Sequence, residues 1–198
     1  PETTMNDRYL EFTNSSLGKT IAGMIGLPTP PRLRRADAPW AVQPLEGRFV
    51  LIGAAAGATL AAPLLRAMAG AGAGLRIVSE NSGLAQIKAA AATLKLNLQG
   101  NPDTEAGESR NHALVFDASG LRSPSQLREL YDFIQPQVRA IARNGRVLLV
   151  SRAPESIDDV NARTAATALR GFIRPLGKEV GKNGTTANLI EVPDGADD

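Results

Sequence analysis

The chain has 198 residues, of which 43% are apolar, 21% are charged and 4% are aromatic. This length and composition allow a full hydrophobic core, so we expect one main domain. The net charge of +2 does not suggest nucleic acid as a partner, and the absence of cysteine excludes disulfides and cysteine-based zinc sites. No run of about 18 apolar residues predicts a membrane span, and the N-terminus lacks a secretory pattern. We therefore expect a cytoplasmic protein.

Residues 1–45 are predicted to form an N-terminal arm, because prolines interrupt any long element there. An apolar stripe at helical spacing predicts one short helix, and it consists of Leu17, Ile21, Met24 and Ile25. Because a single short helix is marginal in water, the stripe should bury against the body or a partner subunit. A basic cluster is formed by Arg32, Arg34 and Arg35. We interpret this cluster as a solvated linker rather than a polyanion site.

Residues 46–198 alternate buried apolar runs with helical patterns. This alternation predicts an α/β fold with a doubly wound, mainly parallel sheet, a Rossmann/flavodoxin-like three-layer sandwich. The expected strands are 49–52, 75–78, 94–98, 113–116, 146–150 and 186–192. The expected helices are 61–69, a helix within 84–98 ahead of its weak strand, 123–142 with a kink at Pro136, and 155–181. A polar, mobile loop is expected at 99–111.

A turn that keeps two glycines of a three-glycine pattern, residues 53–59, follows the first predicted strand. In dinucleotide-binding domains such glycines let the backbone approach a pyrophosphate at a helix N-terminus. Gly53 and Gly57 remain here, and Thr59 occupies the position of the third glycine. Since Pro63 also delays the following helix, we favour a structural turn over a cofactor site.

Other polar residues near strand ends offer weaker alternatives. Glu80 is a candidate acceptor for an adenosine ribose hydroxyl, but we favour an ordinary exposed acid. Asp117 is a candidate ribose or helix contact, and a capped strand end is the favoured interpretation. An independent catalytic set of His112, Asp117 and Ser151 is disfavoured, because ligands of open α/β sheets bind at the carboxyl ends of strands and His112 precedes its strand. We therefore interpret His112 as a surface residue.

The segment Ala168–Glu179, followed by a strand containing Ala187-Asn188, resembles the short-chain dehydrogenase/reductase family. In that family the corresponding helix carries a catalytic tyrosine and, four residues later, a lysine. Counting back from Gly171, the lysine position falls on Ala166 and the tyrosine position on Ala162. An alanine methyl group cannot replace a phenolate or an ammonium group. The resemblance therefore implies that both proton-transfer residues are missing.

Two further catalytic positions of the family are also vacant. The strand Gly145–Arg152 resembles the family's Gly-Arg-Ile strand and places Arg152 at the position of the catalytic serine. Ser151 is a poor replacement, because a shift of one residue turns a strand side chain to the opposite face. The helix that supplies an active-site asparagine corresponds to 123–142, which contains no asparagine. The resemblance implies no catalytic residue in this chain.

The chain as a whole resembles the N-terminal domain of the long, high-molecular-weight type of 3-oxoacyl-acyl-carrier-protein reductase. The segments that carry this resemblance are Asp7–Leu10, Asn14–Gly18, Gly26–Pro30, Leu33–Arg35, Phe116–Gly120 and Gly171–Glu179. The resemblance implies a flavodoxin-like, catalytically degenerate domain, with the family's C-terminal ketoreductase domain absent from this chain.

The implied function is a non-catalytic domain with a packing or oligomerisation role. The parent reaction would be NAD(P)H-dependent reduction of 3-oxoacyl thioesters in fatty-acid metabolism, with NADPH or NADH bound by the parent enzyme and no cofactor bound by this chain. The implied partners are the C-terminal ketoreductase domain, a second copy in a homodimer and, through the parent, acyl carrier protein or acyl-CoA. The alternative is a dinucleotide- or FMN-binding regulatory module, although Thr59 is the turn's one hydroxyl donor for an FMN phosphate.

The family's dimer interface involves the helices that correspond to 123–142 and 155–181. Candidates for core or interface on these helices are Tyr131, Phe133, Ile134, Leu169, Phe172 and Leu176. The sequence does not divide them, because a helix face buried on a sheet and one buried on a partner show the same apolar stripe.

Overall fold

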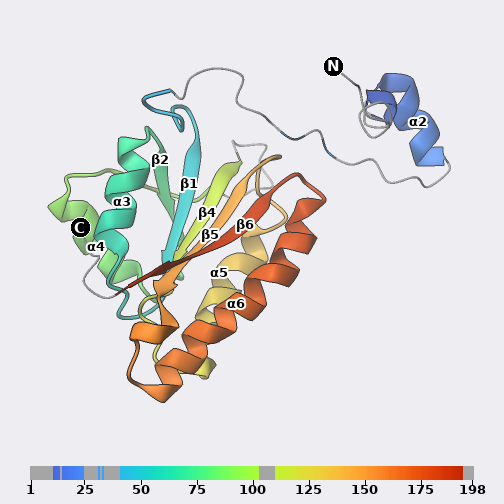
Figure 1. The fold of residues 1–198 in the computed structure, drawn as a ribbon. Coiled ribbons are helices and arrows are strands. Elements are labelled where there is room, and N and C mark those ends of the chain that lie inside the picture. Colours follow the sequence, from blue (N-terminus) through green and yellow to red (C-terminus); the bar gives the residue numbers. More distant parts are fainter. Residues whose placement is uncertain are drawn as a thin grey trace.

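Buried apolar runs build a six-stranded sheet in which all neighbouring strands are parallel (Figure 1). The computed structural model describes residues 11–13, 15–24, 31, 33, 41–102 and 110–193. The strands are β1 (Phe49–Ala54), β2 (Gly74–Ile77), β3 (Leu98–Gly100), β4 (Asn111–Asp117), β5 (Arg146–Arg152) and β6 (Thr186–Val192). Their order is β3-β2-β1-β4-β5-β6, that of the dinucleotide-binding Rossmann fold. The predicted doubly wound α/β class is confirmed.

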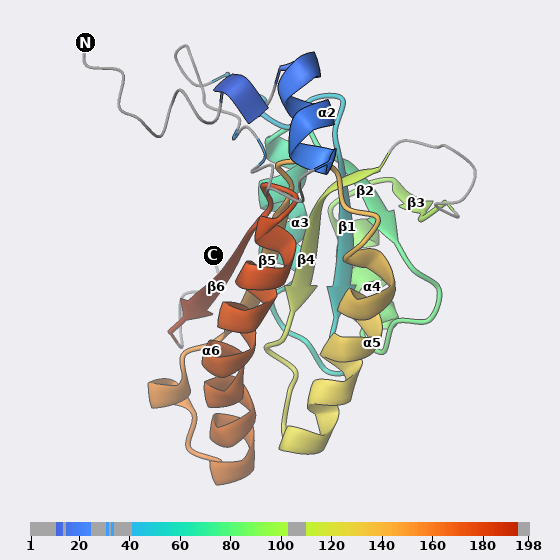
Figure 2. The ribbon, with the colours of Figure 1, turned by 90° about the vertical axis from the view of Figure 1, so that its right-hand side faces the viewer.

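Helices cover the sheet on both faces. Helices α5 (Leu127–Gln137) and α6 (Val160–Gly181) lie on one face, with α3 (Ala61–Gly70) and α4 (Leu84–Thr93) behind the sheet in Figure 2. Right-handed crossovers give this arrangement when the chain winds outward from β1 in one direction and from β4 in the other. The crevice between the carboxyl ends of β1 and β4 is therefore the topological switch point of the sheet.

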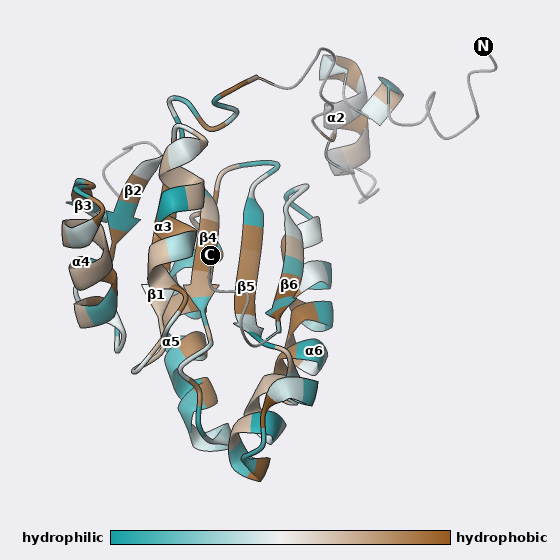
Figure 3. Cartoon of the chain, turned by 60° about the vertical axis from the view of Figure 1, so that its left-hand side comes forward, coloured by the Kyte–Doolittle hydropathy of each residue, from teal (hydrophilic) through white to brown (hydrophobic). Residues whose placement is uncertain are grey.

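The central strands are buried on both faces, which explains their continuous apolar sequence (Figure 3). In β1, Val50 and Ile52 pack against α3 and α4, whereas Leu51 belongs to the cluster beneath α5 and α6. β4 follows the same alternation, with Val115 on the first face and Phe116 on the second. Side-chain alternation along each strand thus supplies both cores.

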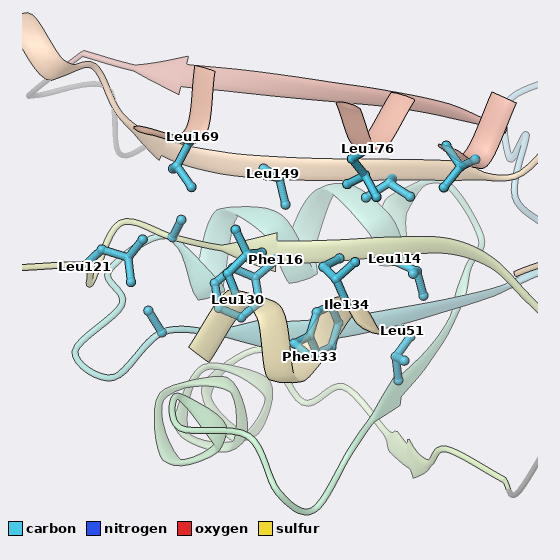
Figure 4. Close-up of a cluster of buried hydrophobic side chains, with 14 of the residues drawn as sticks. Leu51, Leu114, Phe116, Leu121, Leu130, Phe133, Ile134, Leu149, Leu169 and Leu176 are labelled. Atoms are coloured by element: carbon cyan, nitrogen blue, oxygen red, sulfur yellow. The ribbon is translucent and has the colours of Figure 1, made fainter. Parts of the chain in front are cut away.

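The core beneath α5 and α6 contains the large side chains of both helices (Figure 4). The rings of Phe116 on β4 and Phe133 on α5 lie with their centroids 5.3 Å apart. α5 approaches β1 so closely that a Cβ placed on Gly53 would meet the ring of Phe133 at 2.4 Å. Gly53 is therefore required by packing, independently of any ligand.

The structure divides the residues that the sequence left between core and interface. Four are buried in the core, and these are Phe133, Ile134, Leu169 and Leu176. Phe172 is half-buried against the same cluster. Tyr131 is 51% exposed on the outer side of α5, so it is not a core residue.

Several predicted boundaries are wrong, each for a local reason. A 3-10 turn, η2 (Pro124–Gln126), precedes α5, and the helix ends at Gln137 rather than at 142, one residue after Pro136. Pro136 lacks the N–H group that would otherwise donate to the carbonyl four residues earlier, so it weakens the last turn of α5. A second 3-10 turn, η3 (Pro154–Ser156), delays α6 until Asp159, whose carboxylate accepts a hydrogen bond from the N–H group of Ala162 at 2.8 Å.

The segment between α4 and β4 also differs from expectation. β3 begins at Leu98 rather than 94, because Lys95 after α4 adopts a left-handed conformation with φ of 55°. Of the predicted loop 99–111, residues 103–109 lie outside the described residues. His112 lies inside β4 and is half-buried, so its interpretation as a surface residue ahead of the strand is wrong.

A polar cluster holds the amino ends of the strands. Arg76 of β2 is buried, with its guanidinium carbon 3.6 Å from the centre of the Phe49 ring. Its Nη1 donates to Asn111 Oδ1, and Asn111 Nδ2 donates to Asn101 Oδ1. Asn101 in turn donates to Gln137 Oε1 at the end of α5. This chain of hydrogen bonds links the β3–β4 connection to the sheet and to α5.

In the arm, helix α2 spans Ser16–Met24, and the hydroxyl of Ser15 accepts a hydrogen bond from the Gly18 N–H group. The side chains of Leu17 and Met24 are 72% and 81% exposed. Of the two expected arrangements, burial of the stripe against the body is therefore not seen for Leu17 and Met24. Ile25 and the basic cluster Arg32, Arg34 and Arg35 lie outside the described residues. None of the helices in the described ranges has the length and apolarity needed to cross a membrane.

We expect Gly53→Ala to lower the free energy of unfolding by about 1–3 kcal/mol, because the added methyl group must displace the Phe133 ring. Chemical denaturation followed by circular dichroism measures the change. Gly181→Ala is the matched control: it ends α6 in open space, so its effect should stay within about 0.5 kcal/mol. Equal stability of Gly53→Ala and wild type would contradict the packing role.

Candidate functional site

The carboxyl ends of β1, β4 and β5 bring together the residues that the sequence singled out. The glycine turn 53–59 follows β1, Asp117 ends β4, and Arg152 ends β5. Asp117 pairs in register with Ala54, so its carboxylate lies beside the start of the turn. Within the turn Gly57 has φ of 72°, a left-handed conformation suited to glycine.

Asp117 is fully buried, and its carboxylate accepts hydrogen bonds from two backbone N–H groups, one just after the turn and one in the loop after β4. Leu60 donates to Oδ2 at 2.8 Å and Ser119 donates to Oδ1 at 3.0 Å. Leu60 is the N-cap residue of α3 and has no polar side chain of its own to cap the helix. Asp117 therefore supplies, from a neighbouring strand, the negative charge that the start of α3 favours. The predicted capped strand end thus serves a helix as well.

Burial raises the pKa of Asp117 above its ordinary value, although hydrogen bonds from Ser119 and Leu60 and the charge of Arg152 act in the opposite direction. Because the folded-state pKa is raised, the folded chain binds this proton more tightly than the unfolded chain does. The associated stability is present at low pH and is lost as pH rises through the raised pKa. The hydrogen bonds to the carboxylate offset the cost of its charged form.

The hydroxyl groups of Ser119 and Thr59 connect the loop after β4 to Arg152 by hydrogen bonds. The N–H group of Thr59 donates to Ser119 Oγ at 2.8 Å, and Arg152 Nη2 donates to Thr59 Oγ1 at 3.0 Å. The side chain at the family's catalytic serine position thus contacts the turn that would hold a cofactor. Thr59, which accepts this hydrogen bond from Arg152, occupies the position of the third glycine.

Two side chains from outside these strands also accept hydrogen bonds from the turn. Asn81, in the loop after β2, accepts the Ala54 N–H group at 3.0 Å. Glu129, on the first turn of α5, accepts the Ala56 N–H group through Oε2 at 2.8 Å. The backbone N–H groups of 54, 55, 56, 58, 59 and 60 all donate to acceptors of this chain.

Neighbouring backbone closes on the turn from both sides. A Cβ placed on Gly120 would lie 2.3 Å from the Ala56 carbonyl oxygen. A Cβ placed on Gly83 would lie 2.5 Å from the Ala55 carbonyl oxygen. The backbone of both neighbouring loops therefore packs directly against the turn.

The positions of the family's proton-transfer residues are buried and apolar. Ala162 and Ala166 lie on the buried side of α6. Ser151 is buried on the opposite face from Arg152, and its hydroxyl donates to the Arg152 carbonyl at 3.1 Å. The methyl groups of Ala162 and Ala166 cannot move a proton to or from a substrate.

The independent catalytic set is not assembled. His112 lies near the amino end of β4 and Asp117 at its carboxyl end, about 16 Å apart along an extended strand. Ser151 lies near the carboxyl end of β5, at the same edge of the sheet as Asp117, but its side chain faces α6. Glu80, the candidate ribose acceptor, is exposed, and its neighbour Asn81 makes the contact with the turn instead. The described residues contain no group of histidine and acidic side chains suited to a metal ion.

Sequence reasoning missed Asn81, Ser119 and Glu129. Asn81 and Ser119 follow parallel strands, and polar residues after such strands meet at one edge of the sheet, so a signal was available. Glu129 lies within the predicted helix 123–142. Its contact with Ala56 depends on how α5 lies across β1, which no local pattern indicates.

Solved structures that superpose on this chain include short-chain dehydrogenases/reductases. BdcA in complex with NADPH superposes with a TM-score of 0.55 at 19% identity, over 74% of this chain and 70% of that chain. A dehydrogenase/reductase from Sinorhizobium meliloti gives 0.57 at 15% identity, over 75% and 73%. A short-chain dehydrogenase/reductase from Serratia marcescens gives 0.55 at 14% identity, over 75% and 74%.

No family model and no curated protein matches the sequence. The comparisons therefore rest on the fold, which is that of the short-chain dehydrogenase/reductase oxidoreductases.

We expect Asp117→Asn to lower the free energy of unfolding by about 1–3 kcal/mol, because the amide nitrogen cannot accept one of the two N–H groups. For a chain of this size this lowers Tm by roughly 2–12 °C, measured by differential scanning calorimetry. Glu80→Gln, an exposed acid near the same edge, is the control and should leave Tm unchanged. An unchanged Tm for Asp117→Asn would refute the capping role.

Proposed function

We propose that this chain is a non-catalytic domain of the short-chain dehydrogenase/reductase fold that neither binds a nicotinamide cofactor nor carries out hydride transfer. The observation that carries the proposal is the glycine turn, whose N–H groups donate to Asp117, Ser119, Asn81 and Glu129. A dinucleotide would have to displace these acceptors, and two of them are negatively charged. The turn then has a structural role, connecting neighbouring elements by hydrogen bonds.

The vacant catalytic positions support the same proposal. A short-chain reductase needs a tyrosine hydroxyl and a lysine near the substrate carbonyl, and buried methyl groups of Ala162 and Ala166 stand at those positions. Arg152 at the serine position is engaged with Thr59. A bound substrate would therefore meet no proton donor from these positions.

The role we infer is packing against a catalytic domain, as in the N-terminal domain of the long type of 3-oxoacyl-acyl-carrier-protein reductase. The support is the degenerate site together with the segments Phe116–Gly120 and Gly171–Glu179 that resemble that family. In such a parent, a separate ketoreductase domain would bind NADPH or NADH and reduce 3-oxoacyl thioesters carried by acyl carrier protein or coenzyme A.

We also infer a homodimer through the outer faces of α5 and α6. Tyr131 on α5 is 51% exposed and Val160 at the start of α6 is 64% exposed. α6 also carries a recess lined by Arg163 and by three smaller side chains, those of Thr164, Thr167 and Ala168. Small residues let a partner helix approach closely, which supports this face as the contact between copies.

Isothermal titration with NADPH, NADH and FMN tests the first proposal. We expect no saturable heat from the folded wild-type chain, because acceptors of this chain already engage the N–H groups of 54, 55, 56, 58 and 59. An intact short-chain reductase titrated with NADPH is the positive control. Saturable binding in the micromolar range would overturn the proposal and favour a nucleotide-binding regulatory module.

Light scattering after size-exclusion chromatography tests the dimer. We expect Thr167→Arg to shift the chain from dimer to monomer, because a long charged side chain would enter the contact between copies of α6. Ala89→Arg places the same side chain on the exposed side of α4 and should leave the dimer intact. A wild-type monomer, or dissociation by Ala89→Arg alone, would contradict this interface.

A further inference from the structure

The contact between Glu129 and the glycine turn joins groups that are 73 residues apart in the sequence. The carboxylate Oε2 accepts the Ala56 N–H group at 2.8 Å, a distance typical of a charge-assisted hydrogen bond. The contact lies on the solvent side of the turn, unlike the buried contacts of Asp117. Glu129 is therefore the acid at this turn that an ion from solution can replace.

Other residues hold the Glu129 carboxylate in this position. Gln126 Nε2 donates to Glu129 Oε1 at 3.2 Å, and the Arg122 N–H group donates to Gln126 Oε1 at 2.7 Å. Glu129 also lies in the first turn of α5, where the helix dipole favours negative charge. The carboxylate is thus oriented before it meets Ala56, which reduces the entropy lost in making the contact.

We propose that Glu129 is the resident anion of the glycine turn: the turn keeps its capacity to bind a small anion through Ala56, and an internal carboxylate fills it. This inference rests on the proposed function, since it explains how a turn of this type persists without a nucleotide. The geometry limits the capacity to small ions. A carboxylate or phosphate fits where the Glu129 carboxyl group lies, whereas a dinucleotide is far larger than that group.

The test compares wild type with Glu129→Ala, Glu129→Gln and Asp132→Ala. Asp132→Ala removes a negative charge from the same helix, but Asp132 contacts Arg128 rather than the turn. Glu129→Gln keeps an oxygen that accepts the Ala56 N–H group. The Tm of each protein is measured in increasing concentrations of sodium formate and of inorganic phosphate, at constant ionic strength set with chloride.

We expect Glu129→Ala to have a lower Tm than wild type and to regain about 2–4 °C in a saturable manner with formate or phosphate. Wild type, Glu129→Gln and Asp132→Ala should show no saturable gain. A residue that merely packs would not produce rescue by a free anion.

Absence of saturable rescue in folded Glu129→Ala would overturn the inference. Equal rescue of Asp132→Ala would also overturn it, because the response would then reflect net charge. Equal rescue of Glu129→Gln would exclude occupancy of Ala56 as the cause. The proposed function fails on a different result, the binding of NADPH by wild type, so the two failures are distinguishable.

Discussion

The buried carboxylate of Asp117 is the constraint on which the carboxyl edge of the sheet depends. A charge removed from water must have its oxygens satisfied, and here the N–H groups of Leu60 and Ser119 satisfy them. These two groups belong to the segments that follow β1 and β4. One side chain therefore fixes where both loops run, and their closeness determines what else can enter the crevice.

The same edge shows how a chain's own residues can engage the main-chain donors of a glycine turn. A Rossmann sheet leaves polar main-chain groups unpaired at its switch point, and without a nucleotide they need other partners. Asn81 and Glu129 provide acceptors from neighbouring elements, and Gly83 and Gly120 bring neighbouring backbone against the turn. A second polar cluster uses neutral amides instead: the guanidinium of Arg76 donates to Asn111, whose amide donates to Asn101.

The sequence predicts the strands and the sheet class well because both depend on local burial. The run 49–52 is apolar since both faces of β1 are covered, and the predicted strand 186–192 coincides with β6. Helix boundaries were less predictable, because the 3-10 turns at Pro124 and Pro154 cost a few residues each without changing the apolar stripe. At the site, the turn and Asp117 were identifiable from their place after strands. The Glu129 contact was not, since it depends on the approach of α5 to β1.

The close approach of Phe133 to Gly53 has a consequence for how glycine spacing is interpreted in other proteins. Gly53, Gly83 and Gly120 are each confined by neighbouring atoms of this chain, so a side chain at any of them would collide even if no nucleotide ever bound. Natural selection for a stable core would then keep such glycines after selection for a cofactor has ended. A pattern of glycines can thus outlast the chemistry that it usually accompanies, and glycine spacing alone records the ancestry of a loop rather than its present ligand.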